Sequence, residues 1–386
     1  MAKKSRVLII TPGLTYIGGT ELETLVTAKI FFENNVAEEV VIFSPVKASN
    51  SIIENYNEKR IVYWNYPHFF SLGFVQRIDG KFKKIFKLFK RNFSPLQFLY
   101  WWVITLFYRF RFCYIITDSA QFYYAPSLIN LKLDKTLIKF TSCFFSRPWN
   151  SLQKSLLEKT RLIMVTAHSQ KLYLSENYNI KNVCVIDVFI WNENNLLQIS
   201  PNQVSNYTFG MLCRISKEKG LEEGIVLVKK LKDNGVIANL LIRGPSKDRK
   251  YLEFLKQLIK ELNIESNITI DTSPLKPKEI PTFFEIIKIF LITSKFEGGP
   301  NTGLESMAAG LPVLSYSVGA MPERLSSFKD LLIAEDMEEL LEKSIFLINM
   351  KKEEYDKLSE ELRKHYIDNF SNQSILSSTL KYINTN

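Results

Sequence analysis

The stretch of the sequence that carries most chemistry is a Gly-Gly-Pro turn flanked by two glutamates, Glu297 and Glu305. Glu297 follows an apolar run with strand character, and the turn leads into residues that favour a helix beginning near Thr302. Backbone amides at such a turn and helix start suit the phosphate of a sugar phosphate. Carboxylates accept hydrogen bonds from sugar hydroxyls. We therefore interpret the two glutamates as parts of one ligand site.

A second loop carries two cations, Arg214 and Lys219, after a strand that we expect to end at Gly210. An arginine holds a diphosphate through its planar fork, and a lysine holds it as a point charge. The loop therefore suits a diphosphate. Taken alone, it is also typical of a solvated basic turn.

A third loop, near the start of the chain, contains Gly18 and Gly19. Thr20 and Glu23 have the spacing of a capping box, so we expect a helix to start at Thr20. Glycines before a helix let backbone amides approach a phosphate. The pattern lacks the full dinucleotide fingerprint, and an ordinary tight turn explains it equally well.

These loops need a scaffold, and the pattern of apolar runs predicts one. Short Val- and Ile-rich runs alternate with stretches of helical spacing, as in a parallel sheet covered by helices. The expected strands are 6–11, 40–44, 61–64, 113–117, 137–141, 162–166 and 183–188, then 208–212, 238–243, 268–270, 289–293 and 312–315. The expected helices are 21–34, 169–178, 221–234, 248–262, 277–285, 303–309, and charged helices within 337–366.

The alternation lapses at 191–207, which we interpret as an inter-domain connection. The sequence thus predicts an α/β protein of two doubly wound Rossmann-like domains. They would face each other across a cleft at the carboxyl ends of both sheets. We place the first domain at 1–196 and the second at 205–370, with 371–386 as a helix returning to the first domain.

Over essentially its whole length the chain resembles the retaining glycosyltransferases of the GT-B fold, specifically the family 4 group (glycosyl transferases group 1). The motifs that carry the resemblance are 18–21, Arg214 with Lys219-Gly220, 297–305, 307–313 and 319–323. The resemblance implies that Arg214 and Lys219 neutralise the donor diphosphate, which is the leaving group. It assigns the donor sugar to Glu297 and the ribose to Glu305. Its other donor-binding positions are Gly18, Gly19, Gly210, Gly299, Pro300, Asn301, Thr302 and Leu304.

The resemblance further implies a metal-independent transfer without a cofactor. No Asp-x-Asp element stands in a suitable place, and the three histidines are far apart in the sequence. UDP is the expected donor nucleotide, with GDP as the alternative. On the acceptor side we name Asp118, where some relatives carry a histidine, and His168; a helix cap and a purely structural residue are the respective alternatives.

The net charge of +10 is concentrated in one segment. Residues 76–112 hold nine basic residues against the single acid Asp79. Within 82–91, apolar side chains recur at i, i+3, i+4 and i+7 with cations on the other face, as in helices that dock on anionic membranes. The docking residues are Phe82, Phe86, Phe89, Lys83, Lys84, Lys87, Lys90 and Arg91. A core-facing helix with a solvated basic face is the alternative, and no nucleic-acid motif accompanies the charge.

No secretory signal opens the sequence, and the four cysteines have neither metal-binding nor redox spacing. We therefore expect a cytoplasmic protein, peripheral on the inner face of the membrane. Its expected function is sugar transfer from a nucleotide donor to a glycan or lipid-linked acceptor, in cell-surface polysaccharide or lipopolysaccharide synthesis. The alternatives are a sugar-nucleotide epimerase or phosphorylase of the same fold, and a catalytically silent membrane-bound scaffold.

Overall fold

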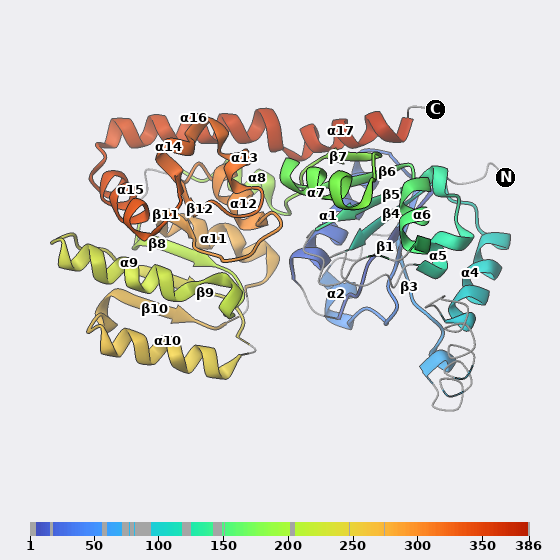
Figure 1. The fold of residues 1–386 in the computed structure, drawn as a ribbon, viewed down its shortest axis with the longest axis horizontal. Coiled ribbons are helices and arrows are strands. Elements are labelled where there is room, and N and C mark those ends of the chain that lie inside the picture. Colours follow the sequence, from blue (N-terminus) through green and yellow to red (C-terminus); the bar gives the residue numbers. More distant parts are fainter. Residues whose placement is uncertain are drawn as a thin grey trace. The chain divides into compact units, whose positions relative to one another are not determined.

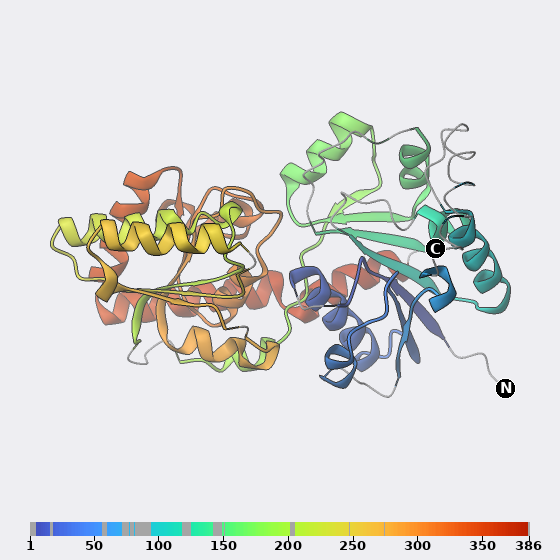
Figure 2. The same cartoon turned by 90° about the horizontal axis from the view of Figure 1, so that it is seen from below.

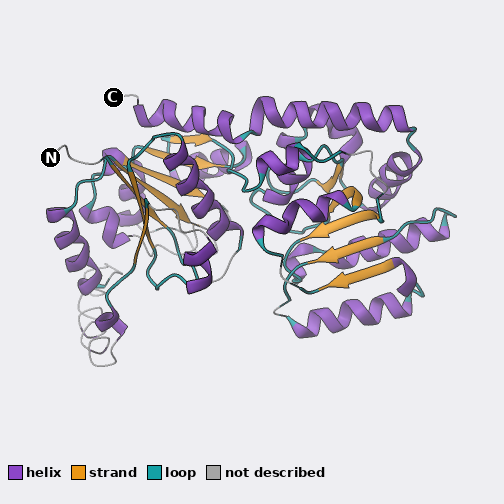
Figure 3. Ribbon diagram, turned by 180° about the vertical axis from the view of Figure 1, so that it is seen from behind, coloured by secondary structure: helices purple, strands orange, loops and turns teal. Residues whose placement is uncertain are grey.

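The computed structural model describes residues 5–15, 18–55, 60–71, 77, 81, 94–117, 125–141, 149, 151–200, 205–246, 248–273 and 275–384. The chain forms two compact units, Met1–Phe189 with Leu376–Asn386, and Ile190–Ile375. Each unit is built on one parallel sheet (Figure 1). Figure 3 shows the strands of each unit among their covering helices.

The first unit has a seven-stranded sheet in the order β3-β2-β1-β4-β5-β6-β7. Its strands are β1 (Arg6–Ile10), β2 (Glu39–Phe43), β3 (Ile61–Trp64), β4 (Phe112–Thr117), β5 (Thr136–Phe140), β6 (Leu162–Val165) and β7 (Val183–Val185). Its helices are α1 (Gly19–Glu33), α2 (Asn50–Asn55), α4 (Pro95–Phe107), α5 (Ala125–Asn130), α6 (Ser151–Lys159) and α7 (His168–Tyr178). The strand order reverses between β1 and β4, where open α/β sheets bind ligands.

The second unit has a six-stranded sheet in the order β10-β9-β8-β11-β12-β13. Figure 2 shows this unit from below, with helices beside its strands. Its strands are β8 (Tyr207–Leu212), β9 (Leu240–Arg243), β10 (Ile268–Asp271), β11 (Ile287–Ile292), β12 (Val313–Tyr316) and β13 (Ile333–Ala334). Its helices are α8 (Glu193–Leu197), α9 (Leu221–Asp233), α10 (Arg249–Glu261), α11 (Ile280–Glu285), α12 (Asn301–Ala308), α13 (Met321–Arg324), α14 (Lys329–Leu332), α15 (Met337–Asn349) and α16 (Lys352–Phe370). Helix α17 (Asn372–Asn384) follows, and from Leu376 onward it belongs to the first unit. The switch point lies between β8 and β11.

Apolar residues on both faces of the central strands form the core of each unit. All six residues of β4 are buried, as are Val7–Ile10 of β1. Strands covered by helices on both sides bury both sets of side chains, which explains the continuous apolar runs in the sequence. The predicted α/β class with two doubly wound Rossmann-like units is confirmed.

The segment between the expected domains differs from a simple connector. The second compact unit begins at Ile190, and the segment contains α8. Glu193 of α8 accepts hydrogen bonds from the Tyr366 hydroxyl at 2.8 Å and the Asn372 amide at 2.6 Å. These contacts attach the start of the segment to α16 and α17, so the compact unit starts before the expected boundary at 196. At the end of the chain, Asn384 accepts a hydrogen bond of 3.0 Å from Arg111 of the first unit.

Candidate active site

The loops that follow β8 and β11 meet at one edge of the second sheet, because the two strands are parallel neighbours. Gly220, which precedes α9, has a φ of 58°. Its carbonyl accepts a hydrogen bond of 2.8 Å from the Thr293 hydroxyl at the end of β11. A Cβ at Gly220 would strike the Thr293 carbonyl oxygen. The left-handed backbone and this close approach both require glycine, and together they hold the two loops against each other.

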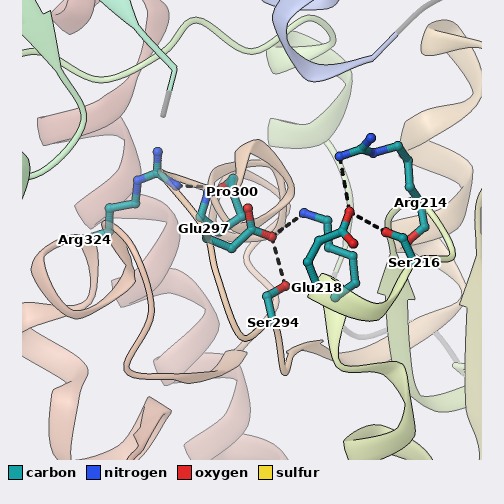
Figure 4. Close-up of polar contacts among 8 residues, drawn as sticks. Arg214, Ser216, Glu218, Ser294, Glu297, Pro300 and Arg324 are labelled. Carbon is teal, nitrogen blue, oxygen red and sulfur yellow. Dashed lines mark hydrogen bonds and ion pairs between the residues drawn. The ribbon is translucent and has the colours of Figure 1, made fainter. Parts of the chain in front are cut away.

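The structure brings Lys219 and Glu297 together across these loops. The Lys219 ammonium donates to Oε1 of Glu297, and the Ser294 hydroxyl donates to the same oxygen at 2.9 Å (Figure 4). Both side chains of the pair are largely buried. Since screening by water is weak for partly buried charges, the pair fixes the orientation of each group. Two residues 78 positions apart therefore form one charged centre.

Arg214 lies on the same loop as Lys219 but is much freer. Its side chain is 63% exposed, and its Nη2 lies 3.6 Å from Oε1 of Glu218. The Ser216 hydroxyl donates to that oxygen at 2.7 Å (Figure 4). An exposed pair of this length contributes little to stability. The guanidinium therefore loses little when it turns from Glu218 to an anionic ligand.

The Gly-Gly-Pro turn is stabilised by contacts with the segment that follows β12. Arg324 is fully buried, and its Nη1 donates to the Pro300 carbonyl at 2.7 Å (Figure 4). Gly319 has a φ of 55°, and a Cβ there would lie 2.7 Å from the Gly298 carbonyl oxygen. The turn can occupy its position only because residue 319 has no side chain. Helix α12 then begins at Asn301, close to the start expected near Thr302.

Glu305 lies in the second turn of α12 and is only 3% exposed. Removal of the carboxylate from water is the effect that acts on it. Burial raises the pKa of Glu305 to about 7. A buried carboxylate with a raised pKa is typical of functional sites.

One donor-side expectation, the end of a strand at Gly210, needs correction. Gly210 does not end a strand: it lies inside β8, and a Cβ there would lie 2.6 Å from Ile287 and 2.8 Å from Phe283. Close packing of side chains against the strand therefore explains this glycine, not a loop around a ligand. The Leu304 side chain is fully buried in the core, so any contact of Leu304 with a donor falls to its backbone. Gly299, Asn301 and Thr302 are partly exposed at the turn and helix start.

In the first unit, Gly18 and Gly19 follow β1 at the switch point. The expected helix start at Thr20 is wrong, since α1 begins at Gly19 with Gly18 as its N-cap. The Gly18 amide donates to Glu21 at 3.1 Å, so Glu21, not Glu23, occupies the capping position. His168 opens α7 after β6 and is exposed. The following predicted residues lie outside the described part of the chain: Asp118, Phe82, Lys83, Lys84, Phe86, Lys87, Phe89, Lys90 and Arg91.

Sequence reasoning missed two groups that shape the site, Ser294 and Arg324. Nothing in the sequence pattern marks Ser294. Arg324 directly follows the segment 319–323, which carried part of the family resemblance, and this position was the available indication.

Comparison with known proteins shows what the second unit and the fold are similar to. Residues 192–365 match the model of the family described as Glycosyl transferases group 1. An uncharacterised glycosyltransferase of Haemophilus influenzae is 27% identical over 247 residues, which are 61% of this chain and 66% of that protein's own length. A glycosyltransferase from Rickettsia africae has a TM-score of 0.74 at 18% identity, over 98% of both chains. HepE of Anabaena, solved in complex with UDP and glucose, has a TM-score of 0.73 at 14% identity, over 98% of this chain and 99% of HepE.

At these identities the solved structures show the fold alone, whereas the family match covers all the loops of the second unit described above. The second unit is therefore similar to the glycosyl transferases group 1 family over residues 192–365, and the chain has the GT-B fold.

Proposed function

We propose that the chain is a glycosyltransferase that moves a sugar from a nucleotide-diphosphate donor to a glycan or lipid-linked acceptor. The observation that carries the proposal is the charged centre of Lys219 and Glu297 beside the turn that opens α12. This centre offers a cation to a diphosphate, a carboxylate to a sugar, and backbone amides to a phosphate. The complex of HepE with UDP and glucose supports a UDP-sugar as the donor.

In the proposed reaction, the bond between the anomeric carbon and the diphosphate oxygen breaks, and the acceptor oxygen bonds to the same carbon. The acceptor proton leaves with the diphosphate. Lys219 and Arg214 stabilise the negative charge that develops on the leaving group, an effect worth about 10²–10³ in rate for one preorganised donor. Glu297 accepts hydrogen bonds from hydroxyls of the donor sugar, and Glu305 accepts them from the ribose.

We propose that the transfer is retaining, with departure and attack on the same face of the sugar, and that it needs no metal ion. The anomeric configuration of the first product, followed by NMR before it equilibrates, tests the stereochemistry. Activity that persists in EDTA tests the metal independence. An inverted product or complete loss of activity in EDTA would overturn the corresponding part.

For the acceptor side of the site we propose Asp118 and His168. The +8 charge of residues 76–112 supports an acceptor presented at an anionic membrane surface, on its cytoplasmic face. Such an acceptor fits the assembly of a cell-surface polysaccharide or lipopolysaccharide.

The first experiment is thermal stabilisation by a panel of nucleoside diphosphates and their sugars, with wild type, Arg214→Ala and Lys357→Ala. A ligand that binds only the folded state raises the unfolding midpoint by mass action. We expect one nucleotide to stabilise wild type and Lys357→Ala, which loses an exposed charge on α16, but to stabilise Arg214→Ala much less. Release of free nucleoside diphosphate only in the presence of acceptor then identifies transfer. A folded protein that no nucleotide stabilises would favour the silent scaffold.

A further inference from the structure

Helix α4 has one face anchored in the core of the first unit. Trp101 is fully buried, and its indole nitrogen donates to the Tyr66 hydroxyl at 3.2 Å. The Trp101 ring also contacts Phe43 of β2 edge to face, with centroids 4.8 Å apart. At the start of the helix, Ser94 caps α4 by accepting from the Gln97 amide. The position of the helix on the first unit is therefore well determined by packing.

The opposite face of α4 is apolar and open to solvent. Five large side chains on this face, each between 39% and 77% exposed, are Leu99, Trp102, Val103, Leu106 and Phe107. The first four are spaced i, i+3, i+4 and i+7, which places them on one side of the helix. Thr105 adds little polarity, because its hydroxyl donates to the Trp102 carbonyl of the same helix. A row of this size is unusual on a soluble protein and indicates an interaction surface.

The charge of the residues that flank α4 in the sequence indicates the kind of partner. Residues 80–117 contain no Asp or Glu. Arg77, Lys81 and Arg109, which flank α4 in the sequence, are exposed. A second copy of the chain would bring the same cations face to face, which is unfavourable, whereas an anionic surface attracts them.

The length of α4 defines how it meets such a surface. The helix has 13 residues, fewer than the ~20 that span a bilayer. Among the helices within the described ranges, none is long and apolar enough to cross a membrane. A short helix with aromatic and aliphatic residues on one side and cations nearby lies in the interface plane, with its apolar face among the acyl chains.

We infer that the exposed face of α4 inserts into the interfacial layer of an anionic bilayer and so anchors the first unit on it. The inference rests on the proposed function only for its purpose, delivery of a lipid-linked acceptor. It differs from docking by charge alone, because five apolar side chains then contribute most of the affinity. Removal of two of them is expected to lower the vesicle partition coefficient more than tenfold.

The test is sedimentation of the full chain with vesicles of equal parts phosphatidylglycerol and phosphatidylcholine. Wild type is compared with the double variant Leu106→Ser/Phe107→Ser and the matched control Ile237→Ser/Phe346→Ser. The control removes one exposed aliphatic and one exposed aromatic residue from the second unit. We expect wild type and the control to sediment with the vesicles, and the α4 variant to bind more than tenfold more weakly. Circular dichroism verifies that both variants are folded.

Three results would overturn the inference: equal binding by wild type and the α4 variant, no binding by wild type, or a wild-type dimer that becomes monomeric in the variant. Thermal stabilisation by the donor nucleotide separates this inference from the proposed function. An α4 variant that loses vesicle binding but keeps nucleotide stabilisation supports the inference. If the protein binds vesicles through α4 but no nucleotide stabilises it, the membrane inference is supported and the proposed glycosyltransferase function is refuted.

Discussion

Replacement of Glu305 by Gln is expected to stabilise the ligand-free protein at pH 8 while it weakens donor binding. Burial raises the pKa of Glu305 from its ordinary value of 4.5 to about 7. A raised folded-state pKa means that the folded protein holds a proton which the unfolded chain has already released. The stability linked to that proton is complete below pH 4.5 and is lost as the pH rises to 7.

The magnitude follows from the two pKa values. They differ by 2.5 pH units, and each unit corresponds to about 1.4 kcal/mol, so the loss amounts to about 3 kcal/mol above pH 7. Gln has nearly the same shape and never ionises. The free energy of unfolding of Glu305→Gln minus that of wild type should therefore rise by about 3 kcal/mol from pH 4.5 to pH 8. Any constant cost of burying the amide cancels in this difference.

The assay is urea denaturation at several pH values, with Glu285→Gln as the matched control. Glu285 ends α11 and is exposed, so its replacement removes a surface carboxylate of the same unit without touching the buried site. A flat difference for Glu305→Gln, or the same slope in the control, would refute the account of Glu305 as a desolvated carboxylate.

The same proton links Glu305 to the donor. If ribose hydroxyls bind the carboxylate form, affinity for the nucleotide sugar should fall by up to tenfold per pH unit below pH 7 and level off above it. A nucleotide sugar is the right probe because its diphosphate diester does not ionise in this range. Calorimetric titration should give a pH-dependent affinity for wild type and a weaker, pH-independent one for Glu305→Gln. A wild-type affinity that does not change between pH 5.5 and pH 8 would separate Glu305 from the donor.

Three further predictions concern the loops. Lys219→Ala should lower kcat by about 10²–10³ in steady-state kinetics, because its charge is needed on the leaving group. It should also lower the unfolding midpoint measured by circular dichroism, because Glu297 is left largely buried without its cation. Gly319→Ala should raise the KM for the donor and lower the free energy of unfolding by well over ~1 kcal/mol, because the new Cβ would lie 2.7 Å from a backbone carbonyl oxygen. The control is Gly235→Ala, where φ is also positive, at 75°, but the space around the residue is open. In urea denaturation this control should lose only about 1 kcal/mol. Arg324→Met should lower the free energy of unfolding by about 1–3 kcal/mol, because the Pro300 carbonyl loses its hydrogen-bond donor. The same variant should raise the KM for the donor. An unchanged KM would show that the turn keeps its shape without this contact.

Twelve of the thirteen strands in the described part of the chain were predictable, because each is a short, mostly apolar run that ends at a polar or glycine-containing loop. Strand β13 (Ile333–Ala334) was not predicted, because two residues are too few to show a pattern. Helix α4 was not predicted as a helix, because its sequence is apolar on both faces and so lacks the 3.6-residue period. The start of α1 was ambiguous for a local reason. Both Glu21 and Glu23 stand three residues after a possible cap, and only the backbone conformation of Gly18 decides between them.

The site was predictable where chemistry and loop position coincide. Glu297, Lys219 and Arg214 follow the two strands at the switch point, and a parallel sheet brings such loops together. Gly210 was misinterpreted because a glycine inside a strand and a glycine that ends one look alike without the neighbouring side chains. Arg324 was missed because its role depends on burial under a turn 24 positions away.

The site combines a rigid backbone frame with charged groups whose electrostatic surroundings are unfavourable or weak. Gly220 and Gly319 allow backbone contacts that no other residue tolerates, and Arg324 fixes the turn from below, so the loops are shaped before any ligand arrives. Arg214 holds only a long, exposed pair, and Glu305 is buried with its pKa raised to about 7. A preorganised frame reduces the cost of ordering on binding, and poorly satisfied charges gain most from a ligand. Substitutions of Gly220, Gly319 or Arg324 should therefore lower both stability and donor affinity. Glu305→Gln, in contrast, should raise stability at pH 8 and lower donor affinity.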